Sequence, residues 1–258
     1  MPQLKYCYKT GVTFTEKVYI HHFLLRILPF ENEAQRAVEK SRYEILPKAK
    51  VCVGFDAFGN KIITGYIDEK HDFFEFLSEG TMETYEYKIR DPHLNRLYLY
   101  PSKLTKPAVR IREIHDRLHV LPEISTADKV AAISQAVASL LRYEPGVTGI
   151  DTTAEEALSL GCGVCQDFSH LMISFCRLNG IPARYAAGFI EGEGFSHAWV
   201  EYYSDGWWYA FDPTHNRPVE TAYIKIAQGR DYADCPLDKG VFRGLAQQQL
   251  DVSVKTEQ

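Results

Sequence analysis

The run GCGVCQDFSHLMISFCRLNG, residues 161–180, constrains the fold of this chain more than any other stretch. Its large apolar residues recur at steps of three and four, which places them on one buried stripe of an α-helix. Gly180 and Pro182 end this helix, and two glycines interrupt any regular structure before it. Cys165 therefore falls at the first helical turn. The unpaired N–H groups and the positive end of the helix dipole there favour a thiolate, which is the nucleophilic form of cysteine.

Two strands downstream supply the groups that a nucleophilic cysteine needs. The run SHAWVEYY, which contains His197, alternates in the manner of a strand, and GWWYAFDPT, which contains Asp212, is typical of the next strand. The turn residues 204–206 between them predict a hairpin. His197 at the start of one strand and Asp212 at the end of its antiparallel partner would lie side by side. A helix-start cysteine with this pair has the nucleophile, base and orienting group of a thiol acyl-transfer site.

The first hundred residues carry short alternating runs rather than helical periodicity. Residues 51–55 and 61–67 flank DAFGN, a connection with glycine and asparagine that predicts another hairpin. Further strands at 73–77 and 84–89 favour a β-sandwich. Prolines mark a junction near residue 100, so we expect a β-sandwich domain at 1–105 and a catalytic domain at 106–258. The predicted fold class is α+β.

The second half of the chain resembles the bacterial branch of the transglutaminase-like superfamily, whose members share a papain-like core. Residues 1–105 also resemble the β-rich region that accompanies this domain, chiefly through DAFGN. The resemblance implies a helix bearing Cys165 packed on an antiparallel sheet, with Cys165, His197 and Asp212 as nucleophile, base and orienting residue. The matching strings are YEPGVTGIDTTAEEAL, GCGVCQDFSHL, GIPARYAAGFI, SHAWVEYY, FDPTHN and GRDYADCPLDKGVFRG.

Other residues are candidates for binding substrate or its oxyanion. The backbone N–H of Cys165 supplies one oxyanion donor, and the neighbouring Gln166 is a candidate for the second. Trp199 shares strand parity with His197 and either shields the imidazole from water or packs in the core. Arg230 and Asp231 fit a GRDY string of the family, and either face the substrate or form an ion-paired structural loop.

Cys162 is the main departure from the family pattern, because it forms a CxxC motif with Cys165. One hypothesis is a reversible disulfide that caps the nucleophile under oxidising conditions; the alternative is a small buried side chain beside the helix. A redox dithiol protein is a competing class, but no preceding strand of a thioredoxin-like βαβ pattern is evident. A zinc site lacks a second CxxC or a close histidine pair, so we expect no metal and no cofactor.

Charge and hydropathy limit the partners of the chain. A net charge of -5 without a long Lys/Arg run argues against nucleic acid. The longest apolar stretch, residues 130–141, is shorter than the about 20 residues that span a bilayer, and the N-terminus lacks a signal-peptide pattern. Six scattered cysteines do not form a disulfide framework. We expect a cytoplasmic protein without a membrane partner.

These observations predict a thiol-dependent hydrolase that cleaves peptide or amide bonds of a peptide or protein through a thioester acyl-enzyme. Three alternatives stay open from the sequence: transfer of the acyl group to an amine, a CxxC redox or zinc protein, and a non-catalytic binding module on the same fold. The natural substrate and the oligomeric state have no signature in the sequence.

Overall fold

A strand of 23 residues, β1 (Gln3–Leu25), organises the N-terminal half of the computed structural model, which describes residues 1–118 and 123–258. Over its first part β1 pairs with β6 (His71–Thr84) and β17 (Gln248–Glu257). Its pairing register then shifts, and its last residues pair with β5 (Lys61–Ile67) and β16 (Asp238–Arg243). The strand therefore belongs to two layers of the same sheet.

The two layers bury their aromatic side chains against each other. Phe74 on β6 lies with its ring 4.8 Å from that of Phe23 and 5.2 Å from that of His21, both on the last part of β1. This packing agrees with the predicted β-rich N-terminal region, and the antiparallel pairing of β4 with β5 confirms the hairpin at DAFGN. The remaining strands of the nine-stranded sheet are β2 (Gln35–Ala37), β3 (Arg42–Leu46), β4 (Lys50–Phe55) and β11 (Gly192–Gly194).

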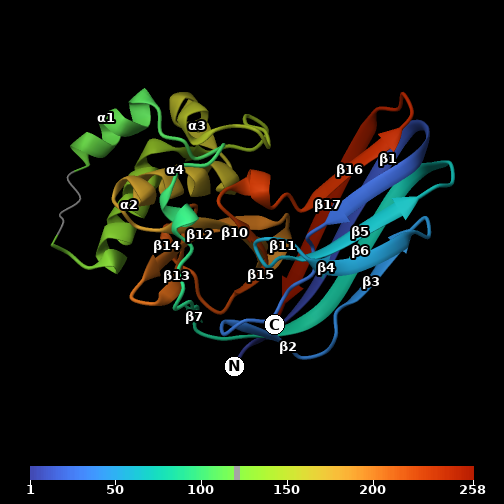
Figure 1. The fold of residues 1–258 in the computed structure, drawn as a ribbon, viewed down its shortest axis with the longest axis horizontal. Coiled ribbons are helices and arrows are strands. Elements are labelled where there is room, and N and C mark those ends of the chain that lie inside the picture. The colour runs from blue at the N-terminus through green and yellow to red at the C-terminus, as the bar shows by residue number, and fades with distance from the viewer. Residues whose placement is uncertain (119–122) are drawn as a thin grey trace.

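The C-terminal strands return to this N-terminal sheet (Figure 1), where the two ends of the chain lie close together. β16 and β17 pair with β1, so residues 238–257, which belong to the predicted domain 106–258, extend the N-terminal sheet. The long edges that β1 offers explain this difference, because a strand gains hydrogen bonds wherever it finds an unpaired neighbour. The predicted boundary at residue 105 divides the chain by sequence position, so it does not describe the return of the C-terminal strands to the N-terminal sheet.

The other half of the molecule is a sheet covered by helices. Helix α4 (Cys165–Leu178) is central, and its residues from Asp167 to Arg177 are all buried. It packs on the sheet on one side and against the other helices on the other. These helices are α1 (Val109–Arg117), α2 (Thr126–Leu140) and α3 (Ala154–Leu160).

The sheet beneath α4 is antiparallel, which confirms the predicted core of a cysteine-bearing helix on an antiparallel sheet. Its strands are β7 (Ile89–Arg90), β10 (Ala183–Ile190), β12 (His197–Ser204), β13 (Trp207–Asp212), β14 (Arg217–Pro218) and β15 (Tyr223–Gly229). The smaller elements are the parallel pair β8 (Arg142–Tyr143) and β9 (Cys162–Gly163) and the 3₁₀ helices η1 (Arg96–Leu99) and η2 (Tyr232–Asp234).

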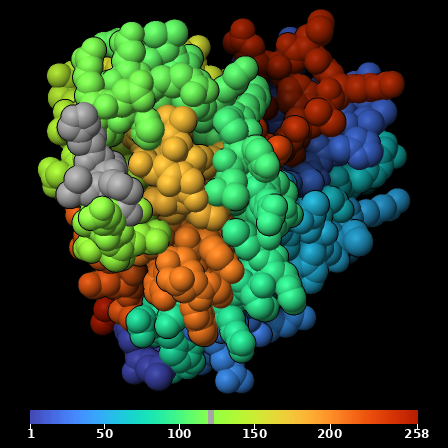
Figure 2. Space-filling model, turned by 60° about the vertical axis from the view of Figure 1, so that its left-hand side comes forward, coloured from blue at the N-terminus to red at the C-terminus, as the bar shows by residue number. Residues whose placement is uncertain are grey.

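The segment between β7 and α1 runs along the surface between the helical half and the N-terminal strands (Figure 2). Arg177 reaches it from α4: its guanidinium donates to the carbonyl of Tyr98 at 3.0 Å and to the hydroxyl of Thr105 at 2.6 Å. The same guanidinium also donates to the carbonyls of Ala183 and Arg230. One buried cation therefore ties this connection to the helix that carries Cys165.

Two side-chain amides join the N-terminal half to β15, the last strand of the second sheet. Gln35 accepts from the backbone N–H of Lys225 at 2.7 Å and donates to its carbonyl at 2.8 Å. Asn60, from the DAFGN loop, makes the same pair of bonds with the backbone of Gln228, at 2.7 and 2.8 Å. Each amide takes the place of a neighbouring strand at this edge, because it both donates to and accepts from the backbone. This role explains why DAFGN ends in a residue with a side-chain amide.

Glu201 holds the buried charges of this half. It is fully buried and accepts hydrogen bonds from Arg184 at 2.6 Å, from Lys225 at 2.7 Å and from the Tyr87 hydroxyl at 2.9 Å. Burial would raise the pKa of this carboxyl, but the two cations lower it to about 2. The carboxylate is thus ionised and fully partnered, as a buried charge must be.

No helix within residues 1–118 and 123–258 is both long enough and apolar enough to cross a membrane.

The Glu201 network predicts a large loss of stability on truncation. Glu201→Ala leaves Arg184 and Lys225 buried without their counter-charge, so we expect the free energy of unfolding to fall by about 3–5 kcal/mol. Urea unfolding measures this change. The matched control is Glu257→Ala, which removes an exposed ion pair with Lys255 and should cost less than about 1 kcal/mol. Equal losses in the two variants would contradict this account.

Candidate active site

Cys165 is the first residue of α4, as the sequence predicts. The side chain of Asp167 caps the helix start, since it accepts from the backbone N–H of Val164 at 2.8 Å and from the hydroxyl of Thr148 at 2.7 Å. A Cβ on Gly163 would lie 2.6 Å from this carboxylate, so glycine is required there. The cap and the glycine together place the thiol at the end of the helix, where it lines an open cleft.

His197 and Asp212 occupy the predicted positions on the hairpin of β12 and β13. His197 Nε2 lies 2.7 Å from Asp212 Oδ2. This contact uses Nε2 of the imidazole and leaves Nδ1 for a second partner. The structure therefore brings the two residues side by side, as the hairpin predicts.

Cys165 and His197 line the same cleft, which has a volume of about 340 Å³. The cleft is larger than a few water molecules need, and aromatic side chains make up much of its wall. Besides the two catalytic candidates, its walls include Tyr143, Gln166, Tyr185, Phe195, Tyr232 and Leu237.

Hydrogen bonding sets the charge of the imidazole. Burial opposes a charge on His197, but hydrogen bonds to Asp212 and then to Cys165 outweigh burial and raise its pKa to about 9. Asp212 is fully buried, which alone would raise its pKa, yet its hydrogen bonds to His197, His215 and Tyr223 hold the pKa well below its usual range. At neutral pH the pair is therefore an imidazolium beside a carboxylate.

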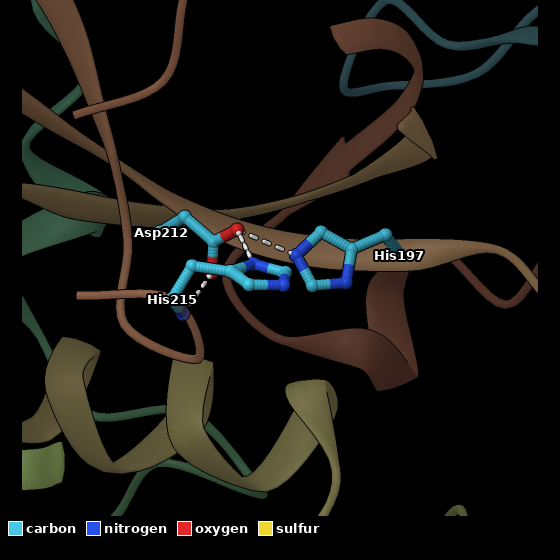
Figure 3. Close-up of side chains that lie close together, drawn as sticks. All are labelled: His197, Asp212 and His215. Carbon is cyan, nitrogen blue, oxygen red and sulfur yellow. Dashed lines mark hydrogen bonds and ion pairs between the residues drawn. The ribbon is translucent and has the colours of Figure 1, made fainter. Parts of the chain in front are cut away.

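The carboxylate of Asp212 has partners that the sequence analysis did not predict (Figure 3). Oδ2 also accepts from His215 Nδ1 at 2.6 Å and from the hydroxyl of Tyr223 at 2.7 Å, while Oδ1 accepts from the backbone N–H groups of Thr214 and His215. The DPTH turn was a usable signal for His215, because it follows Asp212 directly. Tyr223 stands on another strand, and only the fold brings it to the site.

His197, Asp212 and His215 are the kinds of residue that bind metal ions, and their ligand atoms lie within 4.8 Å of one another. Both imidazoles, however, direct these nitrogens at the same oxygen of Asp212. Tyr223 donates to that oxygen as well. The three groups thus converge because they share hydrogen bonds to one carboxylate, and this arrangement fits a positioned base better than a metal site.

Gln166 lines the cleft beside Cys165, so its position agrees with its predicted part in oxyanion binding. Its side-chain Nε2 lies 3.3 Å from the carbonyl of Gly149 and 3.5 Å from that of Ile150. These weak contacts hold the amide toward the loop at 149–150. Its role as the second donor stays a prediction.

Trp199 does not line the cleft, and its position agrees with packing in the core, one of the two alternatives that the sequence left open. It is fully buried, its indole N–H donates to the hydroxyl of Tyr87 at 3.3 Å, and its ring packs edge-on against Tyr223 at 5.4 Å. On the face of β12 that Trp199 shares with His197, the rings of Tyr87 and Tyr223 pack against the indole. Trp199 therefore supports Tyr223 from beneath.

Arg230 and Asp231 make the contacts of a structural loop, which is one of the two alternatives that the sequence left open. The guanidinium of Arg230 binds both oxygens of Asp234 at 2.7 and 2.8 Å. Asp231 is buried, and its carboxylate accepts from the backbone N–H groups of Leu104 and Ala233. Tyr232, which follows Asp231, is the residue of the GRDY string that lines the cleft.

Cys162 is buried and is not among the residues that line the cleft, whereas Cys165 is. It belongs to the short strand β9, which pairs with β8, while Cys165 opens α4. This position agrees with the alternative of a small buried side chain beside the helix. Both cysteines are free, and the reversible disulfide stays a prediction.

Two family models match this chain. Residues 116–213 match the transglutaminase-like superfamily, and residues 4–83 match the bacterial transglutaminase-like N-terminal region. The first match contains Cys165, His197 and Asp212. An uncharacterized protein of Mycobacterium leprae is 27% identical over an aligned length of 281 residues. The alignment covers 99% of this chain and 98% of that protein.

Two further relatives have described functions. The crystal structure of a candidate cysteine protease from Cytophaga hutchinsonii has a TM-score of 0.79 at 23% identity, and covers 99% of this chain and 91% of that one. At this identity the likeness concerns the fold. A protein-glutamine gamma-glutamyltransferase of Pseudomonas aeruginosa is 27% identical over an aligned length of 209 residues. The alignment covers 64% of this chain but only 31% of that protein.

The charge state of His197 predicts the pH dependence of activity. Because the pKa of His197 is raised to about 9, the imidazolium is present below that pH and is lost as the pH rises through it. We expect kcat/KM to decline on the alkaline side near pH 9. Asp212→Asn removes the carboxylate that contributes most to the raised pKa of His197. The alkaline limb should therefore move down toward about pH 6.5, the ordinary pKa of histidine, with a rate loss on the order of 10²-fold or more.

The control for this profile is Asp205→Asn, which changes an exposed aspartate in the turn of the same hairpin. It should leave the profile unchanged. An alkaline limb that stays in place in Asp212→Asn would show that the carboxylate does not set the charge of His197.

Tyr223→Phe tests whether the unexpected donor helps to position Asp212. The substitution removes one hydroxyl that is buried against the carboxylate, so we expect a loss of about 1 kcal/mol in unfolding free energy. We also expect a decrease of about tenfold in kcat/KM, because Asp212 is held less firmly. Tyr66→Phe is the matched control, since it removes an exposed hydroxyl bound to Asp68. Unchanged activity in Tyr223→Phe would make the contact purely structural.

Proposed function

Because the chain belongs to the transglutaminase-like superfamily and carries the bacterial N-terminal region of that family, we propose that it is a thiol hydrolase of peptide or amide bonds. Membership makes it an enzyme of the cysteine peptidase or transglutaminase-like class. The observation that carries the proposal is the contact of 2.7 Å between Asp212 and His197, because His197 lines the same cleft as Cys165.

In the proposed reaction the sulfur of Cys165 attacks the carbonyl carbon of the substrate. His197 holds the proton of the thiol on Nδ1, the ring nitrogen that Asp212 leaves free, and delivers it to the leaving amine as the C–N bond breaks. The product of this step is a thioester. Water then attacks the thioester and gives a proton to His197, and the C–S bond breaks to release the acid, which leaves Cys165 as a thiolate beside the imidazolium. Asp212 keeps the imidazole oriented and stabilises its charge.

The start of α4 supports the negative charge that develops on the carbonyl oxygen. The first backbone N–H groups of a helix lack intrahelical acceptors, so the N–H of Cys165 is free to donate to the oxyanion. Gln166, at the wall of the same cleft, is the second donor that we propose. Both donors are placed next to the nucleophile by the chain itself.

We propose that water is the acceptor of the acyl group, so that the enzyme is a hydrolase. Its partner is a peptide or protein substrate, and we propose neither nucleic acid nor a membrane as a partner. The alternative is transfer to an amine, which the likeness to a protein-glutamine gamma-glutamyltransferase favours. A CxxC redox or zinc protein is less well supported, because Cys162 is buried and does not line the cleft that holds Cys165. We place the enzyme in the cytoplasm, where free thiols such as those described here persist.

Cys165→Ala is the decisive variant. We expect a peptide or amide library to yield at least one substrate for the native protein, and turnover to fall by on the order of 10³-fold or more in the variant. The melting temperature should change little, because the side chain faces a cleft. Cys52→Ala, which removes an exposed thiol from β4, should retain full activity.

The acceptor is identified in the same assay by adding a primary amine. A hydrolase releases the free acid at a rate that the amine does not change, whereas an acyltransferase forms the amide at the expense of the acid. Mass spectrometry of the rapidly quenched protein should show the acyl group on Cys165. Equal turnover in Cys165→Ala would refute the proposed nucleophile.

A further inference from the structure

Tyr232 separates the cleft at Cys165 from a second cavity of about 210 Å³, which lies against the nine-stranded sheet. A single water needs only about 10–15 Å³, so a side chain of moderate length fits. Tyr232 lines both spaces, and consecutive residues of the chain divide between them: Leu237 lines the cleft and Asp238 lines the cavity. The cavity is thus a close neighbour of the proposed active site.

Asp238 is the charged residue of the cavity. Among the residues that the structure describes, none donates a hydrogen bond to its carboxylate or forms an ion pair with it, and no lysine or arginine lines the cavity. Burial raises its pKa to about 6, so the group is still ionised in weakly alkaline solution. A partly buried carboxylate without a counter-charge is costly unless a cation from outside completes it.

His21 adds a second acceptor to the same cavity. Nδ1 of His71 donates to the carbonyl of Glu69 at 2.8 Å, which leaves Nε2 of His71 to accept from Nδ1 of His21 at 3.1 Å. Burial lowers the pKa of His21 to about 4, so this ring is neutral. Its Nε2 then bears a lone pair, next to the space that Gly240 leaves open.

Aromatic rings form much of the remaining wall, namely Phe14, Phe74, Phe242 and Tyr232. A primary ammonium has three donors and no acceptor, and it is attracted to the faces of aromatic rings. A carboxylate and a bare ring nitrogen in an aromatic cavity match that chemistry. We propose that this cavity binds a primary ammonium group of the substrate, with Asp238 as its counter-charge.

The inference rests on the proposed function for the identity of the ligand as substrate. An ammonium seated at Asp238 would hold the rest of the substrate on the other side of Tyr232, where Cys165 lies. The backbone of Tyr232 is held in place, because its N–H donates to Nε2 of the buried His170 at 3.1 Å. Asp238 would then select substrates by charge, and the N-terminal sheet would supply part of the substrate site.

Binding can be measured without turnover in the Cys165→Ala protein. We expect n-butylammonium to bind in calorimetry at pH 8 at least about tenfold more tightly than 1-butanol, its neutral counterpart. Asp238→Asn in the same background should weaken n-butylammonium binding by at least about tenfold. Asp251→Asn, which neutralises an exposed aspartate on β17, should leave the affinity unchanged.

A second variant guards against a folding defect in Asp238→Asn. A Cβ at position 240 would lie 2.9 Å from Nε2 of His21, so Gly240→Ala narrows the cavity while all charges stay in place. We expect it to weaken n-butylammonium binding as well. Equal affinity for 1-butanol, or full affinity for n-butylammonium in Asp238→Asn, would overturn the proposal.

Peptide ligands distinguish the two sources of the ammonium. Both peptides of the first pair are acetylated at the N-terminus, and one contains lysine where the other contains norleucine. Both peptides of the second pair lack lysine, and one has a free α-amine where the other is acetylated. Loss of affinity in one pair identifies the source, and no loss in either pair overturns the proposal. Because Cys165→Ala is used throughout, failure here is separate from failure of the proposed hydrolase, which is judged by the acyl group on Cys165.

Discussion

One carboxylate oxygen, Oδ2 of Asp212, accepts hydrogen bonds from three side chains on different segments of the chain. His197 opens β12, His215 follows the turn after β13, and Tyr223 begins β15. A buried carboxylate must be compensated in this way, because its desolvation alone would drive it to the neutral form. The need to satisfy Asp212 therefore fixes three strands relative to one another and orients the imidazole at the same time.

The strand that carries Tyr223 links the proposed active site to the N-terminal half. Gln35 and Asn60 bind the backbone of β15 through their side-chain amides, at positions that a further strand would otherwise occupy. The N-terminal region is thus attached at the edge of the catalytic sheet. With β16 and β17 returning to β1, the chain closes this attachment from both ends.

The arrangement gives a physical reason for a β-rich region beside a thiol active site. The cleft at Cys165 is formed mainly by the helical half, whereas the cavity behind Tyr232 is walled largely by strands of the N-terminal sheet. A hollow of about 790 Å³ at residues 149–160 lies beside α3; it is larger than the cleft at Cys165, yet Cys165, His197 and Asp212 do not line it. Size therefore does not identify the site; the convergence of titratable groups does.

The sequence by itself determined the helix that begins at Cys165, the hairpin that pairs His197 with Asp212 and the hairpin at DAFGN. These features depend on periodicity, glycine stops and turn residues, which act over a few positions of the chain. Tertiary structure alone decided that Tyr223 binds Asp212, that Trp199 is buried under it, that Arg230 and Asp231 hold a loop, and that the C-terminal strands join β1. Each of these depends on contacts between distant segments, and a local pattern shows that a face is buried but not what covers it.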